Sequence, residues 1–223
     1  MKLTTEQIEY VENYIISKDI KWYELQVELT DHMVTSMEGF WEKNPELAFH
    51  QVKQYAENIF VGDSSFKSIE KERTLILQKE YKSSRLKMVK DYLSFPKIIG
   101  TVLAVLAIYK ISFYFQDSIK FISRLFLFLF LFLIPISYQW IKNLKIEGKR
   151  FLAIENSPAY WALLSFPNLG LSLSNVFKDE ILQNHLVLLP FICLWVLGSL
   201  FCITGIHLND KIVATIKKQY QLT

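Results

Sequence analysis

The chain has 223 residues, of which 51% are hydrophobic and 15% aromatic, and its formal net charge at pH 7 is +3. This hydrophobic content is high for a water-soluble protein of this length. Residues 1–95 are polar and charged, whereas residues 98–207 hold long apolar runs, which predicts a domain boundary between them. Cys193 and Cys202 lie in one apolar run and would face opposite sides of a helix, which excludes a disulfide framework.

Residues 1–66 have the pattern of a small cytosolic head with three helices. Thr4 and Thr5 precede an acidic first turn and predict a capped first helix. A second helix is expected from Trp22 to Asn44-Pro45, and a third from about Glu46. The head carries twelve acidic and five basic residues, so its surface is expected to be acidic.

A basic helix and an apolar region are expected to follow the head. Residues 67–95 predict a long linker helix, since residues 67–97 hold nine basic and four acidic side chains. Crossing the ~30 Å hydrocarbon core takes about 20 residues, and four stretches approach this length. These stretches predict an all-α fold with a four-helix transmembrane bundle over residues 96–207: 96–115, 121–140, 158–177 and 186–207. Residues 208–223 form a short tail.

The distribution of Lys and Arg predicts the topology. Six lie in residues 79–97, four in the loop 142–150 and three in the tail, whereas the other two turns hold four. Since basic residues are enriched on the cytoplasmic side, the head, this loop and the tail are expected in the cytoplasm. The third span is the weakest, because polar residues and Pro167 interrupt it, but without it the tail and its lysines would lie outside.

The third stretch also holds the candidate membrane polar site. An interrupted helix can line a binding site. Hydrogen bonding to a neighbouring helix is the favoured alternative, because the small residues of the fourth stretch would let another helix approach closely. The same small residues permit a homo-oligomer. The candidate polar residues are Ser165, Asn168, Ser172 and Asn175.

The basic linker helix is expected to contact anionic lipid headgroups, because attraction to the inner leaflet is worth about 1 kcal/mol for each basic residue near the surface. This attraction to lipid accounts for the basic charge of the linker helix, so no nucleic-acid partner is expected. The candidate headgroup contacts are Lys79, Lys82, Arg85, Lys87 and Lys90.

No motif in the sequence indicates an enzyme, a cofactor or a metal site. A phosphate-binding glycine loop, zinc-ligand spacing and a nucleophile elbow are all missing. His32 has no second histidine at helical spacing, so we expect it to face the interior of the head and bond a neighbouring group. Lys110 and Arg124 lie near the outer boundary, where long side chains reach the headgroups. We therefore expect no catalytic or metal-binding residues.

The head resembles the helical prefix domains (HAAS-like) of bacterial multi-span membrane proteins that accompany PadR-type transcriptional regulators. The resemblance rests on Tyr23-Glu24-Leu25, on the segment from Glu28 to Met33 with Asp31-His32, on Glu38 and on Asn44-Pro45-Glu46. The chain lacks the glycine-rich turn that such domains have before the third helix. The resemblance implies a cytosolic protein-interaction module without catalytic residues.

Taken together, these patterns predict a non-enzymatic regulator or sensor in the bacterial cytoplasmic (inner) membrane, with both termini in the cytosol. Its head is expected to bind a cytosolic protein, and no cofactor is expected. The alternative is a small transporter or permease component that uses the polar third span. A soluble partner captured by the head would favour the first hypothesis, and solute flux that depends on Asn168 would favour the second.

Overall fold

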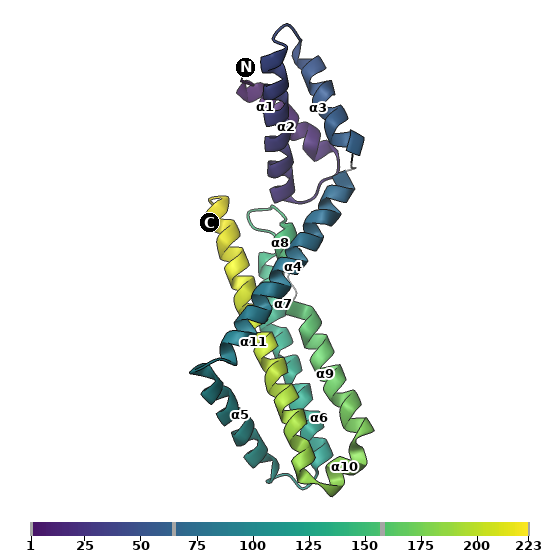
Figure 1. Ribbon diagram of the computed structural model, residues 1–223, viewed down its shortest axis with the longest axis vertical. Coiled ribbons are helices and arrows are strands. Elements are labelled where there is room, and N and C mark those ends of the chain that lie inside the picture. Colours follow the sequence, from purple (N-terminus) through teal and green to yellow (C-terminus); the bar gives the residue numbers. More distant parts are fainter. Residues whose placement is uncertain (1, 64–65, 157–158, 223) are drawn as a thin grey trace. The chain divides into compact units, whose positions relative to one another are not determined.

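The computed structural model describes residues 2–63, 66–156 and 159–222, with side chains outside 60–67 and 157–163. Within these residues the protein is all-α, as predicted, with helices and one isolated bridge (Figure 1). It divides into two compact units. The head unit comprises Met1–Leu77 and Leu144–Glu155, and the second unit comprises Gln78–Asn143 and Asn156–Thr223.

The head unit is built on three helices that lie side by side: α1 (Thr5–Ser17), α2 (Tyr23–Lys43) and α3 (Phe49–Asp63) (Figure 1). The Thr4 hydroxyl accepts a hydrogen bond from the Gln7 amide, and the Gln7 side chain bonds the Thr4 amide in return. This capping box satisfies two donors that have no partner inside the helix. The predicted cap of the first helix is therefore confirmed.

The core of the head unit follows the apolar stripe of α2, whose buried residues recur every four positions. These are Leu25, Leu29, Met33, Met37 and Trp41. Val11 and Ile15 of α1 and Val52 and Ala56 of α3 complete the cluster. His32 is exposed, so the prediction that it faces the interior is wrong. Its neighbour Met33 occupies the stripe, and adjacent helical residues point about 100° apart.

Residues 144–155 return to the head unit, which the sequence prediction did not include. The chain turns tightly at Ile146–Lys149, where these two residues exchange backbone hydrogen bonds of 3.0 Å. Glu147 and Gly148 have φ values of 51° and 79°, as a type I′ turn requires. A short helix, α8 (Leu152–Glu155), follows, and Leu152 joins the core of the head unit.

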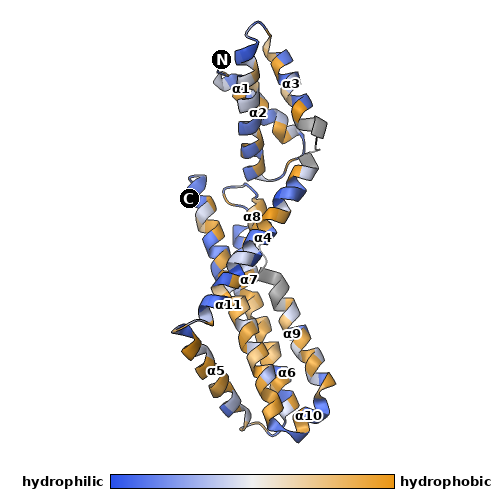
Figure 2. Cartoon of the chain, in the orientation of Figure 1, coloured by the Kyte–Doolittle hydropathy of each residue, from blue (hydrophilic) through white to orange (hydrophobic). Residues whose placement is uncertain are grey.

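The second unit contains the apolar helices, which Figure 2 shows as mostly hydrophobic. The long helix α4 (Phe66–Tyr92) passes from the head unit into the second unit. The elements that follow are α5 (Lys97–Ser112), α6 (Ser118–Phe128), η1 (Leu129–Phe132), α7 (Leu133–Asn143), α9 (Ala159–Val176), α10 (Lys178–Gln183), η2 (His185–Val187) and α11 (Leu188–Gln219). Residues of the predicted tail up to Gln219 continue α11.

Two helical stretches of the described residues are long and apolar enough to cross a membrane. They are Ser118–Asn143, with 26 residues, and His185–Gln219, with 35 residues. The bent pair Ser68–Tyr92 and Lys97–Ser112, whose axes differ by 76°, qualifies as a third stretch if the two are counted together. The 18 residues of α9 extend about 27 Å. The structure thus has two or three helices of membrane-crossing length and composition.

Two prolines account for breaks in these helices. Proline lacks an N–H group and collides with the preceding turn, and the 3-10 stretch Leu129–Phe132 ends three residues before Pro135. Pro96 lies between α4 and α5, where the residue before a proline is biased away from helix. The break in the helical stretch Ser118–Asn143 therefore precedes Pro135.

The packing of the second unit centres on α9, which contacts both α11 and α6. Gly170 of α9 lies against the Phe126 ring, so closely that an added Cβ would overlap it. Gly198 of α11 faces Phe166 of α9. Each glycine thus lets an aromatic side chain approach a helix backbone.

Candidate functional site

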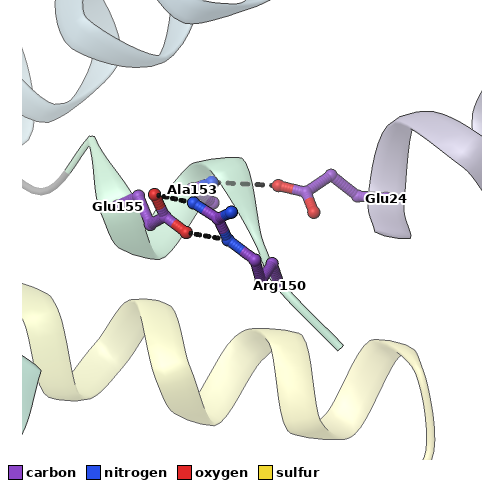
Figure 3. Close-up of polar contacts among 4 residues, drawn as sticks. All are labelled: Glu24, Arg150, Ala153 and Glu155. Atoms are coloured by element: carbon purple, nitrogen blue, oxygen red, sulfur yellow. Dashed lines mark hydrogen bonds and ion pairs between the residues drawn. The ribbon is translucent and has the colours of Figure 1, made fainter. Parts of the chain in front are cut away.

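The starts of α2 and α8 satisfy each other's backbone donors. The Tyr23 amide donates to the Arg150 carbonyl at 2.9 Å. The Ala153 amide donates to Glu24 Oε1 at 2.9 Å, as Figure 3 shows. The first N–H groups of a helix have no partner inside it. Trp22, the N-cap residue of α2, makes no side-chain cap. The returning segment therefore supplies a partner that the head sequence does not.

An ion pair and aromatic contacts surround these two hydrogen bonds. Arg150 binds Glu155 through two parallel hydrogen bonds of 2.7 and 2.9 Å (Figure 3). Its guanidinium carbon lies 4.8 Å from the centre of the Trp22 ring, and the Lys149 ammonium lies 3.8 Å from that of Tyr23. Paired hydrogen bonds and cation–π contacts fix the direction of these side chains. We call this region, Trp22–Glu24 with Lys149–Glu155, the return contact.

Glu24 is the titratable group of the return contact that burial affects most. Burial raises the pKa of its carboxyl group, while hydrogen bonds from the amides of Ala153, of Leu152 and of Glu24 itself lower the pKa. Its second oxygen, Oε2, has no hydrogen-bond partner within the described part of the chain. Burying an incompletely paired carboxylate is unfavourable, so the charged form of Glu24 weakens the return contact.

Apolar burial offsets this penalty. Phe151, Leu152 and Ile154 are each at most 2% exposed. Burying a side chain of this size stabilises a fold by about 1.5–3 kcal/mol. The three together contribute roughly 5–9 kcal/mol as an upper bound, because an unfolded chain already buries part of its surface. Of these three, Leu152 lies in the core cluster of the head unit and the Phe151 ring contacts that of Tyr23, so apolar packing helps to hold the returning segment in the head unit.

The head unit also has a charged cleft of about 510 Å³ between the turn after α1 and the side of α4. Three lysines and two acidic residues line it: Lys18, Lys21, Lys71, Asp19 and Glu70. Such a lining suits a partner segment that carries charges of both signs.

The candidate polar residues of the third span lie on the exposed face of α9. Ser165, Asn168, Ser172 and Asn175 are all exposed. The Asn168 amide donates to the Leu164 carbonyl of the same helix at 2.8 Å. The face of α9 that packs against α6 carries Gly170 and none of these four residues. Asn168 therefore does not make the hydrogen bond to a neighbouring helix that was the favoured alternative for this segment.

Four of the five candidate headgroup contacts are exposed on α4: Lys79, Lys82, Lys87 and Lys90. Arg85 differs, because it is only 5% exposed and donates to the Phe201 carbonyl of α11 at 2.7 Å. Tyr81, Arg85 and Val89 recur every four residues on the buried face of α4. Arg85 thus joins α4 to α11 within the second unit.

The return contact is the feature that sequence reasoning missed. Its available signals were the apolar run Phe151–Ile154 inside a short polar connection and the Glu147-Gly148 pair, which favours a tight turn. A run of four apolar residues cannot by itself reveal which surface buries it. Pairing this run with Trp22–Glu24 required the tertiary structure.

The geometry defines an all-α protein with a helical head and two or three apolar helices of membrane length. Within the described ranges, no group of three or more His, Cys, Asp or Glu side chains could hold a metal ion. Comparison with family models, curated proteins and solved structures finds no match for this chain. The resemblance of the head to helical prefix domains therefore stays a prediction.

Proposed function

We propose that this protein is a non-enzymatic membrane regulator or sensor whose cytosolic head binds a protein partner. The observation that supports it most is the return contact. Residues 144–155 connect α7 to α9 and belong to the head unit, and Leu152 lies in its core. A change in the arrangement of α7 and α9 would pull on this segment. The head could thereby report the state of the membrane helices.

The shared core also supports the proposed topology. Residues 1–77 and 144–155 pack into one unit, so both must lie on the same side of a membrane. We propose that α5 and the α6–α7 stretch cross the membrane between these two segments, and that α9 and α11 cross it between the loop and the C-terminus. With two crossings in each interval, the head, the loop and the C-terminus would share one side of the membrane. The thirteen flanking basic residues favour the cytoplasmic side.

Labelling of single cysteines tests this topology. We would replace Cys193 and Cys202 by Ser, and then introduce Lys145→Cys in the loop, Tyr114→Cys in the outer turn or Gln221→Cys in the tail. A membrane-impermeant maleimide should label Tyr114→Cys in intact cells and the other two only after permeabilisation. Labelling of Gln221→Cys in intact cells would show that α9 does not cross.

The exposed surface of the head suggests the chemistry of its partner. Glu6, Glu9 and Glu12 of α1 are exposed, and the head carries an excess of acidic residues. Opposite charges steer association and favour one partner over others. We therefore propose a protein partner with a basic surface.

Photo-crosslinking in intact membranes tests the partner. A crosslinking residue would replace Glu9 on α1 or Lys18 in the charged cleft, and Tyr114 in the outer turn would serve as the control position. We expect one recurring protein adduct from a head position and none of that mass from Tyr114. Repeated failure of both head positions to yield an adduct would argue against a partner-binding head.

A transporter component is the second candidate, favoured by the polar residues on the exposed face of α9. Asn168 and Ser172 would then contact a solute in the membrane. Asn168→Leu and Ser172→Leu should abolish solute flux without lowering the amount of protein in the membrane. Unchanged flux in both variants would rule out this function.

A further inference from the structure

The second unit contains an apolar groove between α5 and α11. Its volume is about 450 Å³, within the range of about 300–1,000 Å³ that is typical of ligand sites. Gly100 and Ala104 of α5 form one wall, and Trp195, Ser199 and Ile203 of α11 form the other. The small side chains on α5 leave the space, because a Cβ added to Gly100 meets no atom within 4 Å.

One end of the groove is polar and charged. Lys97 and Tyr92 line the groove and also line a smaller adjoining pocket of about 170 Å³. Asp91 of α4 and His207 of α11 also line this smaller pocket. The Lys97 ammonium lies 5.1 Å from the centre of the Tyr92 ring. The cavity therefore combines an apolar length with an end that offers one cation and one carboxylate.

The groove has the length of one membrane leaflet. Trp195 and Ile203 are eight residues apart on α11, which corresponds to about 12 Å, whereas half of the hydrocarbon core is about 15 Å. On α5 the groove lining ends at Ala104, and the following Val105 and Ile108 pack against the core of the second unit. A membrane-spanning helix would need a groove of about twice this length.

The polar end lies near the inner end of the apolar helices. His207 is two residues before Asn209, whose side chain contacts Gln139 of α7, and Gln139 also donates to Asp210 at 2.9 Å. Polar contacts of this kind are favourable near the headgroups and costly in hydrocarbon. The pocket therefore lies where the headgroup of an inner-leaflet lipid would be.

We propose that this groove binds one glycerophospholipid with an amine in its headgroup, such as phosphatidylethanolamine. An acyl chain occupies the apolar length between Gly100 and Trp195. The phosphate pairs with the Lys97 ammonium, and the primary ammonium of the headgroup donates to the Asp91 carboxylate. A choline headgroup has no N–H donor, and a glycerol headgroup has no positive charge, so both match Asp91 less well.

Native mass spectrometry of the full-length protein tests this proposal. The purified protein would be incubated with equal amounts of phosphatidylethanolamine, phosphatidylglycerol and phosphatidylcholine that share the same acyl chains. We expect the wild type to retain one phosphatidylethanolamine molecule. Lys97→Gln should lower retention about fivefold, the effect of one basic residue near a membrane surface. Asp91→Asn should remove the preference for phosphatidylethanolamine over phosphatidylglycerol.

Substitution by a larger side chain inside the groove provides a second test of lipid retention. Gly100→Leu should abolish retention by filling the open space, whereas Leu103→Phe, an exposed position of α5 outside the groove lining, should not change it. Lys90→Gln is the matched charge control for Lys97→Gln. Equal retention by wild type, Lys97→Gln and Gly100→Leu would overturn the proposal. A dimer that Gly100→Leu abolishes would instead identify a second copy in the groove.

This inference rests on the proposed membrane location but not on a partner of the head. Extraction of cell membranes with alkaline carbonate distinguishes a wrong membrane location from a wrong lipid site. If the protein is released into the soluble fraction, the membrane location itself is wrong. If it stays in the membranes and retains no lipid, only the lipid site is wrong.

Discussion

Replacing Leu152 by Ala would test whether the returning segment stabilises the head. Leu152 is 2% exposed and lies in the same cluster as the buried residues of α1, α2 and α3. Substitutions of Leu by Ala in a protein core cost about 2–5 kcal/mol, from lost burial and the cavity left behind. Since small domains are stable by only about 5–15 kcal/mol, this loss is a large fraction of the total.

Hydrogen exchange of the full-length protein in lipid nanodiscs measures this effect. A loss of 2–5 kcal/mol raises the unfolding equilibrium roughly 30- to 4,000-fold, so peptides from α2 should exchange faster by a factor in this range. Lys145→Ala, an exposed position in the same segment, should change the stability by less than about 0.5 kcal/mol. If Leu152→Ala leaves exchange in α2 within threefold of wild type, the segment is not part of the head core.

Two further predictions follow from burial and close packing. Because burial raises the pKa of Glu24 above its ordinary value of 4.5, its favourable contribution is present below that pH and is lost as the pH rises through the raised pKa. Glu24→Gln keeps an acceptor for the Ala153 amide, so denaturant melts should show the variant gaining stability relative to wild type from pH 4 to pH 7, and an unchanged difference would refute this. Gly170→Ala should destabilise the second unit by about 1–3 kcal/mol through overlap with Phe126, whereas Gly100→Ala should be neutral or stabilising by up to about 1 kcal/mol. Thermal melts of both variants in one detergent compare them, and equal melting temperatures would contradict the packing of α9 on α6.

The local elements of this protein could be predicted from its sequence because their signals are local. The capping box at Thr4 and Gln7 uses residues three apart, and the end of α2 depends on Asn44-Pro45. The apolar runs that become the α6–α7 stretch and α11 exceed the length needed to cross a membrane. These features therefore follow from periodicity, capping and length.

The predictions failed where a residue's environment depends on a distant segment. Arg85 belongs to a basic run and looked like its neighbours, but the side of α4 on which it lies packs against Phe201, 116 residues away. His32 is adjacent to the buried Met33, and only the packing of α2 decides which of the two faces the core. Charge and composition do not contain this information.

The sequence by itself determined that the chain is helical, that its N-terminal part is polar and that long apolar helices follow. Only the tertiary structure decided that residues 144–155 complete the head and that α5 and α11 enclose a groove. The reason is physical. Helix formation depends on neighbours within a few residues, whereas burial of Leu152, like the cap that Arg150 provides for α2, depends on contacts between residues more than 100 positions apart.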